Sequence, residues 1–155
     1  MNFFNKIEKP YFLAEIGVNH NGSLKKAKKL ILSAKESGAN GVKFQTFSAK
    51  NLAEKSTPKV KYQLETTGNK ETHFQMLKKL ELSFDEQVQL NKYCKKLKID
   101  FISTPYDLES AKFLSKLKVP FFKTASADLV DVELHEYIAS KNVPVVISVG
   151  MATYT

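Results

Sequence analysis

Five short apolar runs along this chain end in polar or charged residues, and stretches with helical periodicity separate them. The expected strands cover residues 11–17, 41–47, 100–104, 120–125 and 144–149. Strands that alternate with helices through short links form a parallel sheet with right-handed crossovers. A (β/α) barrel builds its site at the C-terminal ends of such strands. The pattern therefore predicts an α/β fold of TIM-barrel type, with polar side chains gathered at one mouth.

The segments between the strands carry start and stop signals of helices. Ser23 is placed to cap a helix that Gly38 ends in a left-handed conformation. Ser83 and Glu86 fit a capping box, and Asp107 is placed to cap the next helix. Further helices are expected over 71–80, 84–97, 108–117 and about 132–141. The polar excursion from 48 to 70 is long for a connection, and such loops are often functional.

The number of strands leaves two architectures open. A closed eight-stranded barrel typically needs about 250 residues, and this chain has 155. The chain is therefore either the first five β/α units of a longer barrel or a complete five-stranded doubly wound domain. In the first case the first and fifth strands are unpaired edges, which favour association.

Composition and charge exclude several classes of protein. The net charge is +8 and the pI about 9.4. The lysines of 25–29 and 95–98 recur at helical spacing, so we interpret them as solvated helix faces. We therefore expect no nucleic-acid partner. No run approaches the ~18 apolar residues of a membrane span. The N-terminus lacks the pattern of a signal peptide. The single cysteine, Cys94, excludes an internal disulfide. These features predict a cytoplasmic protein without membrane contact.

The polar strand ends suggest an anion-binding site. Lys43 and Lys123 would place two ammonium groups at one mouth, and hydroxyl groups would add further donors. The candidate hydroxyl groups belong to Thr104, Ser126 and Ser148. Two cations with several hydroxyls suit a small ligand that carries both a phosphate and a carboxylate.

Two carboxylates lie near these lysines in the expected arrangement. Glu15 and Asp128 are candidates for proton transfer or for orienting a sugar hydroxyl. The alternative is that they form structural ion pairs with Lys43 and Lys123.

The three histidines of the chain have no metal-ligand spacing. We expect a structural role for His20, and no chemistry for His73 and His135, which fall in predicted helices away from the strand ends. Any metal would need ligands from outside this segment, or help from carboxylates within it.

Six sequence blocks occur in order and together resemble the N-terminal part of the sialic acid (N-acetylneuraminate) synthase family. The blocks are AEIGVNHNGS (14–23), GVKFQTF (41–47), MLKKLELSFDEQ (76–87), FISTPYD (101–107), FFKTASADL (121–129) and VPVVISVGMAT (143–153). The resemblance covers the chain from Tyr11 to Thr153.

The resemblance implies a phosphoenolpyruvate-dependent (β/α)8 barrel followed by an antifreeze-like (SAF) domain. Residues 1–155 would be the N-terminal portion of that barrel, without its remaining strands and the SAF domain. The family condenses phosphoenolpyruvate (PEP) with an N-acetylated aminosugar such as N-acetylmannosamine. The product is a sialic-acid-type nonulosonate for surface polysaccharides. The implied cofactor is Mn²⁺ or Mg²⁺, and the implied full-length state is a homodimer.

The resemblance also implies roles for individual residues. Positions that hold the PEP phosphate and carboxylate match Lys43, Thr104, Lys123, Ser126 and Ser148. Glu15 matches a catalytic glutamate, and Gln45 matches a neighbouring active-site glutamine. Asp128 stands where many bacterial members have glutamate. The family's metal-binding histidines lie on later strands, so this segment is expected to hold no metal ligand and to be inactive alone.

Two alternatives to this function stay open. One is another PEP-dependent synthase of 3-deoxy sugar acids, of the KDO-8-phosphate or DAHP type. The other is an inactive segment that binds a partner through its exposed edges.

Overall fold

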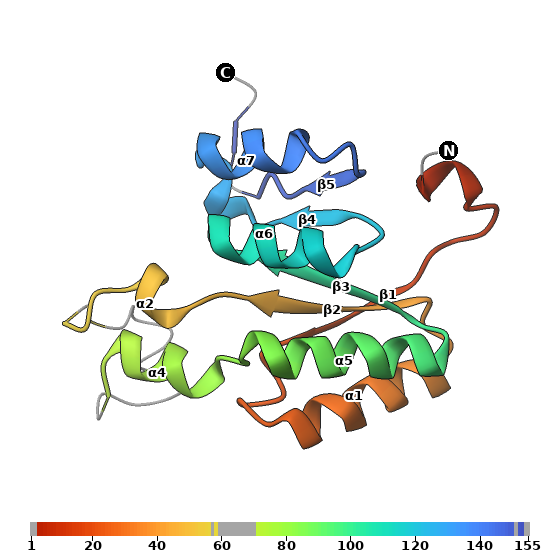
Figure 1. Ribbon diagram of the computed structural model, residues 1–155, viewed down its shortest axis with the longest axis horizontal. Helices are drawn as coiled ribbons and strands as arrows, with labels where there is room; N and C mark the ends of the chain where they lie inside the picture. The colour runs from red at the N-terminus through yellow and green to blue at the C-terminus, as the bar shows by residue number, and fades with distance from the viewer. Residues whose placement is uncertain (1–2, 57, 59–70, 151, 154–155) are drawn as a thin grey trace.

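Parallel strands alternate with helices along the part of the chain that the structure describes (Figure 1). The computed structural model describes residues 3–56, 58, 71–150 and 152–153. The element order is η1 (Phe3–Lys6), β1 (Leu13–Gly17), α1 (Leu24–Glu36), β2 (Gly41–Thr46), α2 (Ala49–Leu52), α4 (His73–Leu80), α5 (Phe84–Leu97), β3 (Asp100–Pro105), α6 (Leu108–Leu117), β4 (Phe122–Thr124), η2 (Ser126–Asp128), α7 (Val132–Ala139) and β5 (Val145–Ile147). The predicted α/β alternation is confirmed. The predicted excursion over 48–70 begins with α2, and its residues 57 and 59–70 lie outside the described residues.

The strands form two parallel sheets, in the orders β1-β2-β3 and β4-β5. The prediction of one continuous sheet is therefore wrong at the junction of β3 and β4, which contact each other without a shared ladder. β4 has only 3 residues, and Pro120 just before it lacks an N–H to donate, which limits the ladder that β4 can form. β1 and β5 each pair with one neighbour in the described chain, as expected for edge strands.

Alternation along β2 separates a helix-covered face from an open face. Val42 and Phe44 are buried in the main core together with residues of α1 and α5, which lie side by side on this face (Figure 1). Burying a side chain such as Phe44 contributes about 1.5–3 kcal/mol. Because successive side chains point to opposite faces, Lys43 and Gln45 lie on the face that the helices leave open.

Local capping interactions fix where the helices begin and end. The Ser23 side chain accepts a hydrogen bond from Lys26 N at 3.3 Å, and Asp107 Oδ1 accepts one from Ser110 N at 2.7 Å. The capping box predicted at Ser83 is present at the start of α5. Gly38 has a φ of +85° just after α1. These predictions are confirmed because capping depends on neighbours in the sequence.

Candidate functional site

An ion pair between β1 and β2 forms the centre of the open face. Glu15 and Lys43 are register partners in the ladder of these strands, so their side chains leave the sheet side by side. Lys43 Nζ lies 2.6 Å from Glu15 Oε2 and donates a hydrogen bond to Thr104 Oγ1 of β3 at 3.2 Å. The Lys43 side chain is 13% exposed and that of Glu15 is 53% exposed, so the pair opens toward solvent on the Glu15 side.

Lys123 of β4 faces the same region but has a different set of partners. Its Nζ donates to the backbone oxygen of Thr124 at 2.8 Å and to the hydroxyl of Ser148. No carboxylate of the described residues forms an ion pair with it. Burial lowers the pKa of Lys123, the positive charge of Lys43 lowers it further, and Glu15 opposes both effects. The alternative of two structural ion pairs is therefore right for Lys43 and wrong for Lys123.

A bulge in β1 brings Gln45 close to the Glu15 carboxylate. The register shifts between Glu15 and Gly17, and Gly17 has a φ of +53°. A Cβ atom on Gly17 would lie 3.2 Å from Glu15 Oε1 and 3.7 Å from Gln45 Nε2. Glycine at this position therefore leaves room for both side chains, and bulges of this kind commonly direct side chains near a site.

The segment after β4 carries Ser126 and Asp128 on the short helix η2. Ser126 Oγ lies 3.4 Å from the point that a Cβ of Gly150 would occupy, so it adjoins the chain that follows β5 and Ser148. Burial raises the pKa of Asp128, and the nearby charge of Asp131 adds to this. Within the described part of the chain, Asp128 Oδ2 is buried without a hydrogen-bond partner. Such a carboxyl group holds its proton more readily than an exposed one.

His135 contacts this segment. His135 lies in α7, as expected, and its Nε2 lies 3.1 Å from the backbone oxygen of Asp128 in η2. The contact is with backbone, which favours a structural role. The first turn of α7 follows η2 directly, and this places the histidine against η2.

The sequence reasoning did not single out Tyr106, which directly follows Pro105 at the end of β3. Tyr106 is half-buried. Burial raises its pKa, and the negative charges of Asp128 and Glu15 raise it further, in that order. Its hydroxyl therefore shares the electrostatic environment of both carboxylates. Its position directly after a strand end was the available signal.

A buried polar network supports the ends of β2 and β3. Thr46 Oγ1 donates to Gln87 Oε1 at 2.6 Å and lies 2.6 Å from Ser103 Oγ, which must then be the donor in that contact. Gln87 Nε2 donates to the backbone oxygen of Leu82 at 3.1 Å. Thr46 and Ser103 are sequence neighbours of Gln45 and Thr104, so the network fixes the backbone beneath two candidate site residues. The polar Gln87 on the buried face of α5 was the signal for it.

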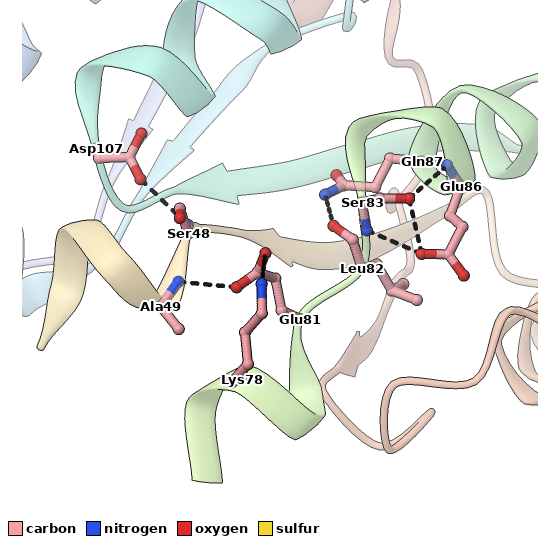
Figure 2. A network of polar contacts seen from close by, with 9 residues as sticks. All are labelled: Ser48, Ala49, Lys78, Glu81, Leu82, Ser83, Glu86, Gln87 and Asp107. Carbon is pink, nitrogen blue, oxygen red and sulfur yellow. Dashed lines mark hydrogen bonds and ion pairs between the residues drawn. The ribbon is translucent and has the colours of Figure 1, made fainter. Parts of the chain in front are cut away.

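Two further carboxylates hold the chain where it leaves β2, as Figure 2 shows. Asp107 Oδ2 accepts a hydrogen bond from Ser48 N at 3.3 Å, and Glu81 Oε2 accepts one from Ala49 N at 3.0 Å. Lys78 Nζ lies 2.9 Å from Glu81 Oε1. Asp107 also caps α6. The start of α2 is therefore tied to α6 and to the segment after α4.

The loop after β1 is structural and packs against the segment after α4. His20 is 1% exposed, and its Nδ1 accepts a hydrogen bond from Gly22 N at 3.0 Å. Burial lowers the pKa of His20. Gly22 approaches the end of α4 so closely that a Cβ would lie 2.1 Å from the backbone oxygen of Lys79. The expectation of a structural role for His20 is confirmed.

The described residues contain no group of three or more His, Cys, Asp or Glu side chains that could hold a metal ion. They also contain no helix with the length and apolar character that crossing a membrane requires. Cys94 is buried in the core, where desolvation raises the pKa of its thiol to about 12.

Comparison with known proteins shows what this chain resembles. The profile of the NeuB family matches residues 30–155. The N,N'-diacetyllegionaminic acid synthase of Campylobacter jejuni is 44% identical over 146 residues, which are 94% of this chain and 44% of that protein. The enzyme of the same name from Legionella pneumophila is 43% identical over 141 residues, which are 91% of this chain and 40% of that protein.

A solved structure shows the same similarity at the level of the fold. The N-acetylneuraminic acid synthetase of Leptospira borgpetersenii, crystallised in complex with citrate, superposes with a TM-score of 0.77 at 28% identity. The match covers 94% of this chain and 47% of that chain. The present chain thus spans less than half the length of these relatives.

Proposed function

The chain belongs to the NeuB family, and we propose that it forms the PEP-binding part of an enzyme that condenses PEP with an N-acetylated aminosugar. The reaction would release phosphate and give a sialic-acid-type nonulosonate for surface polysaccharide biosynthesis. The names of the Campylobacter and Legionella relatives, both synthases of such an acid, support this reaction class.

The observation that carries the proposal is the pair of lysines on the open face of the strands. Lys43 and Lys123 are near enough for the charge of one to lower the pKa of the other. A dianionic ligand would relieve this repulsion, because its two negative charges would lie between the two ammonium groups. The citrate in the Leptospira structure is a polyanion bound by a relative. PEP carries a carboxylate and a phosphate and matches the same requirement.

The remaining candidate residues would complete the anion site around these lysines. The hydroxyl of Thr104 already contacts Lys43, and that of Ser148 contacts Lys123, so each ammonium group stands beside a further donor for a ligand oxygen. We assign Ser126 and Gln45 to the same set of ligand contacts. Glu15 neutralises Lys43 in the free protein, so binding of the anion must compete with that ion pair.

The two carboxyl groups suit opposite directions of proton transfer. When C3 of PEP attacks the open-chain aldehyde of the sugar, the aldehyde oxygen gains negative charge and needs a proton. Burial favours the protonated form of Asp128, which makes it the candidate donor. Water then adds at C2 and must lose a proton, for which the Glu15 carboxylate is the candidate acceptor. The tetrahedral intermediate expels phosphate by cleavage of its C–O bond.

We propose further that these residues form the first five β/α units of a (β/α)8 barrel. Large apolar side chains are exposed along the two edge regions, which suits burial against further strands. They include Phe12 at 66%, Ile147 at 49% and Val149 at 60% exposure. An antifreeze-like domain, a homodimeric state and a cytoplasmic location accompany this proposal as predictions.

A divalent Mn²⁺ or Mg²⁺ ion is a further prediction for the complete enzyme. The described residues do not fit such an ion by themselves, because no three potential ligands gather and Glu15 is engaged by Lys43. Its ligands would lie outside this chain. None of the proton transfers assigned to Glu15 and Asp128 depends on the ion.

A substrate screen on a complete barrel that carries this segment tests the reaction. Phosphate release from PEP is measured with N-acetylated aminosugars and, in parallel, with phosphorylated aldoses that lack an acetamido group. We expect release with the first group only. Release with the second group alone would instead indicate a synthase of the DAHP or KDO-8-phosphate type. Absence of PEP binding would indicate an inactive binding segment.

A further inference from the structure

The two lysines of the site differ in the charge that surrounds them. The ammonium group of Lys43 is compensated by Glu15, with Nζ and Oε2 separated by 2.6 Å. Lys123 Nζ contacts two neutral oxygens, the Thr124 carbonyl and the Ser148 hydroxyl. Across the described ranges, it has no carboxylate as an ion-pair partner. The site therefore combines one compensated cation with one amine that has no direct counter-charge.

The environment of Lys123 is one that makes a lysine nucleophilic. Partial burial and the neighbouring Lys43 charge both lower the pKa of Lys123. Proteins activate lysine amines in two such ways, by desolvation and by a second cationic group close by. The charged groups that act on Lys123 come from β2 and β1, namely Lys43 and Glu15. Glu15 lies against Lys43 and raises the pKa of Lys123, so it offsets part of the lowering by burial and by Lys43.

We propose that Lys123 forms a reversible imine with small 2-keto acids, of which pyruvate is the simplest. The neutral amine nitrogen attacks the keto carbon, so a C–N bond forms and the C=O bond becomes a hydroxyl. The hydroxyl then leaves as water, whose oxygen comes from the keto group and whose two hydrogens come from the amine nitrogen. The Ser148 hydroxyl, which contacts the amine, is placed to relay a proton. The step needs no oxidant or reductant.

The rest of the site suits the carboxylate of such an acid. Lys43 and the Thr104 hydroxyl, 3.2 Å apart, can hold a carboxylate between them. The keto carbon is bonded directly to the carboxylate carbon and would then face Lys123 across the open face. This inference rests on the anion-binding part of the proposed function, but it concerns a different reaction. A bound keto acid would exclude PEP, so 2-keto acids should act as reversible inhibitors of PEP binding.

Reductive trapping with pyruvate tests the proposal on the chain itself. The protein is incubated with pyruvate and sodium cyanoborohydride, and labelled peptides are mapped by mass spectrometry. All 24 residues counted as lysine or arginine are lysines, so the other lysines serve as internal competitors. We expect Lys123 to acquire the reduced pyruvyl group several times faster than the mean of the exposed lysines. PEP should slow this labelling and leave that of the exposed lysines unchanged.

Variants separate nucleophilic chemistry from simple charge. Lys123→Arg retains a cation without a nucleophilic amine, so the preferred label should disappear. Lys112→Arg alters an exposed lysine on α6 and should leave labelling of Lys123 unchanged. The wild-type peptide map identifies the labelled residue by itself, so the test does not depend on the folding of a variant.

Two outcomes would overturn the inference. One is even labelling of all exposed lysines, and the other is preferred labelling elsewhere with Lys123 unmodified. A parallel thermal-shift titration with PEP keeps the two proposals separate. If PEP binds and Lys123 is not labelled, the imine proposal fails and the proposed function stands. If Lys123 is labelled and PEP neither binds nor protects, the proposed function fails and the imine proposal stands.

Discussion

Replacing Gly22 with alanine tests how the loop after β1 is held against the end of α4. Gly22 has a φ of +69°, and an added Cβ would lie 2.1 Å from the backbone oxygen of Lys79. The left-handed conformation costs an L-residue about 1–2 kcal/mol. Relief of the overlap requires backbone movement, at a further cost of about 1–3 kcal/mol. The lower entropy of the unfolded alanine chain offsets about 0.4–1 kcal/mol. The expected net loss is therefore about 1–5 kcal/mol.

Gly38→Ala is the matched control for this prediction. Gly38 also has a positive φ, +85°, but nothing lies within 4 Å of its added Cβ. This variant should lose only the conformational part, about 0–1.6 kcal/mol. Urea unfolding followed by circular dichroism gives both free energies. Equal losses in the two variants would refute the argument, because the contact with Lys79 would then not explain the need for glycine at position 22.

Three further predictions follow from the buried network, the buried histidine and the ion pair. Gln87→Leu removes the hydrogen-bond donor to Leu82 O and the acceptor for the Thr46 hydroxyl. This change should reduce the free energy of unfolding by about 2–4 kcal/mol. Gln89→Leu, at an exposed position of the same helix, should change that free energy by less than about 0.5 kcal/mol. Burial lowers the pKa of His20 below its ordinary 6.5, so the neutral histidine contributes its full stability above that pH and loses it as the pH falls through the folded-state pKa. His20→Gln should remove this part of the acid sensitivity when urea unfolding is followed as a function of pH. An unchanged pH profile would contradict this prediction. Glu15→Gln frees Lys43 from its 2.6 Å ion pair and should strengthen PEP binding severalfold, as measured by calorimetry. Weaker binding would instead show that Glu15 helps to hold the ligand or to position Lys43.

Local sequence signals predicted the elements better than their pairing. The helix expected over 108–117 is α6, Leu108–Leu117, because Asp107 caps its start within the same segment. The strands expected over 120–125 and 144–149 are shorter, Phe122–Thr124 and Val145–Ile147. Their length depends on partners in the sheet, which the sequence of one strand does not specify.

In the candidate site, too, the sequence predicted single residues better than their contacts. Alternation within strands and the family resemblance located Glu15, Lys43 and Lys123, and the structure brings them to one face. Which lysine pairs with which carboxylate depends on register and on strand neighbours. The pattern therefore allowed ion pairs for both lysines, and among the described residues the structure forms the one between Lys43 and Glu15. Tyr106 and Gln87 were missed because their contacts join segments that are distant in the sequence.

Calorimetric titration of this chain with PEP tests the central claim most directly. Lys123→Ala removes one charge-assisted contact and should weaken binding by about 2 kcal/mol or more, which is about 30-fold in the dissociation constant. Lys112→Ala, at an exposed position on α6, should bind PEP like the unaltered chain. Equal PEP affinity in all three proteins, or no binding to any of them, would contradict the assignment of the PEP site to the open face of these strands.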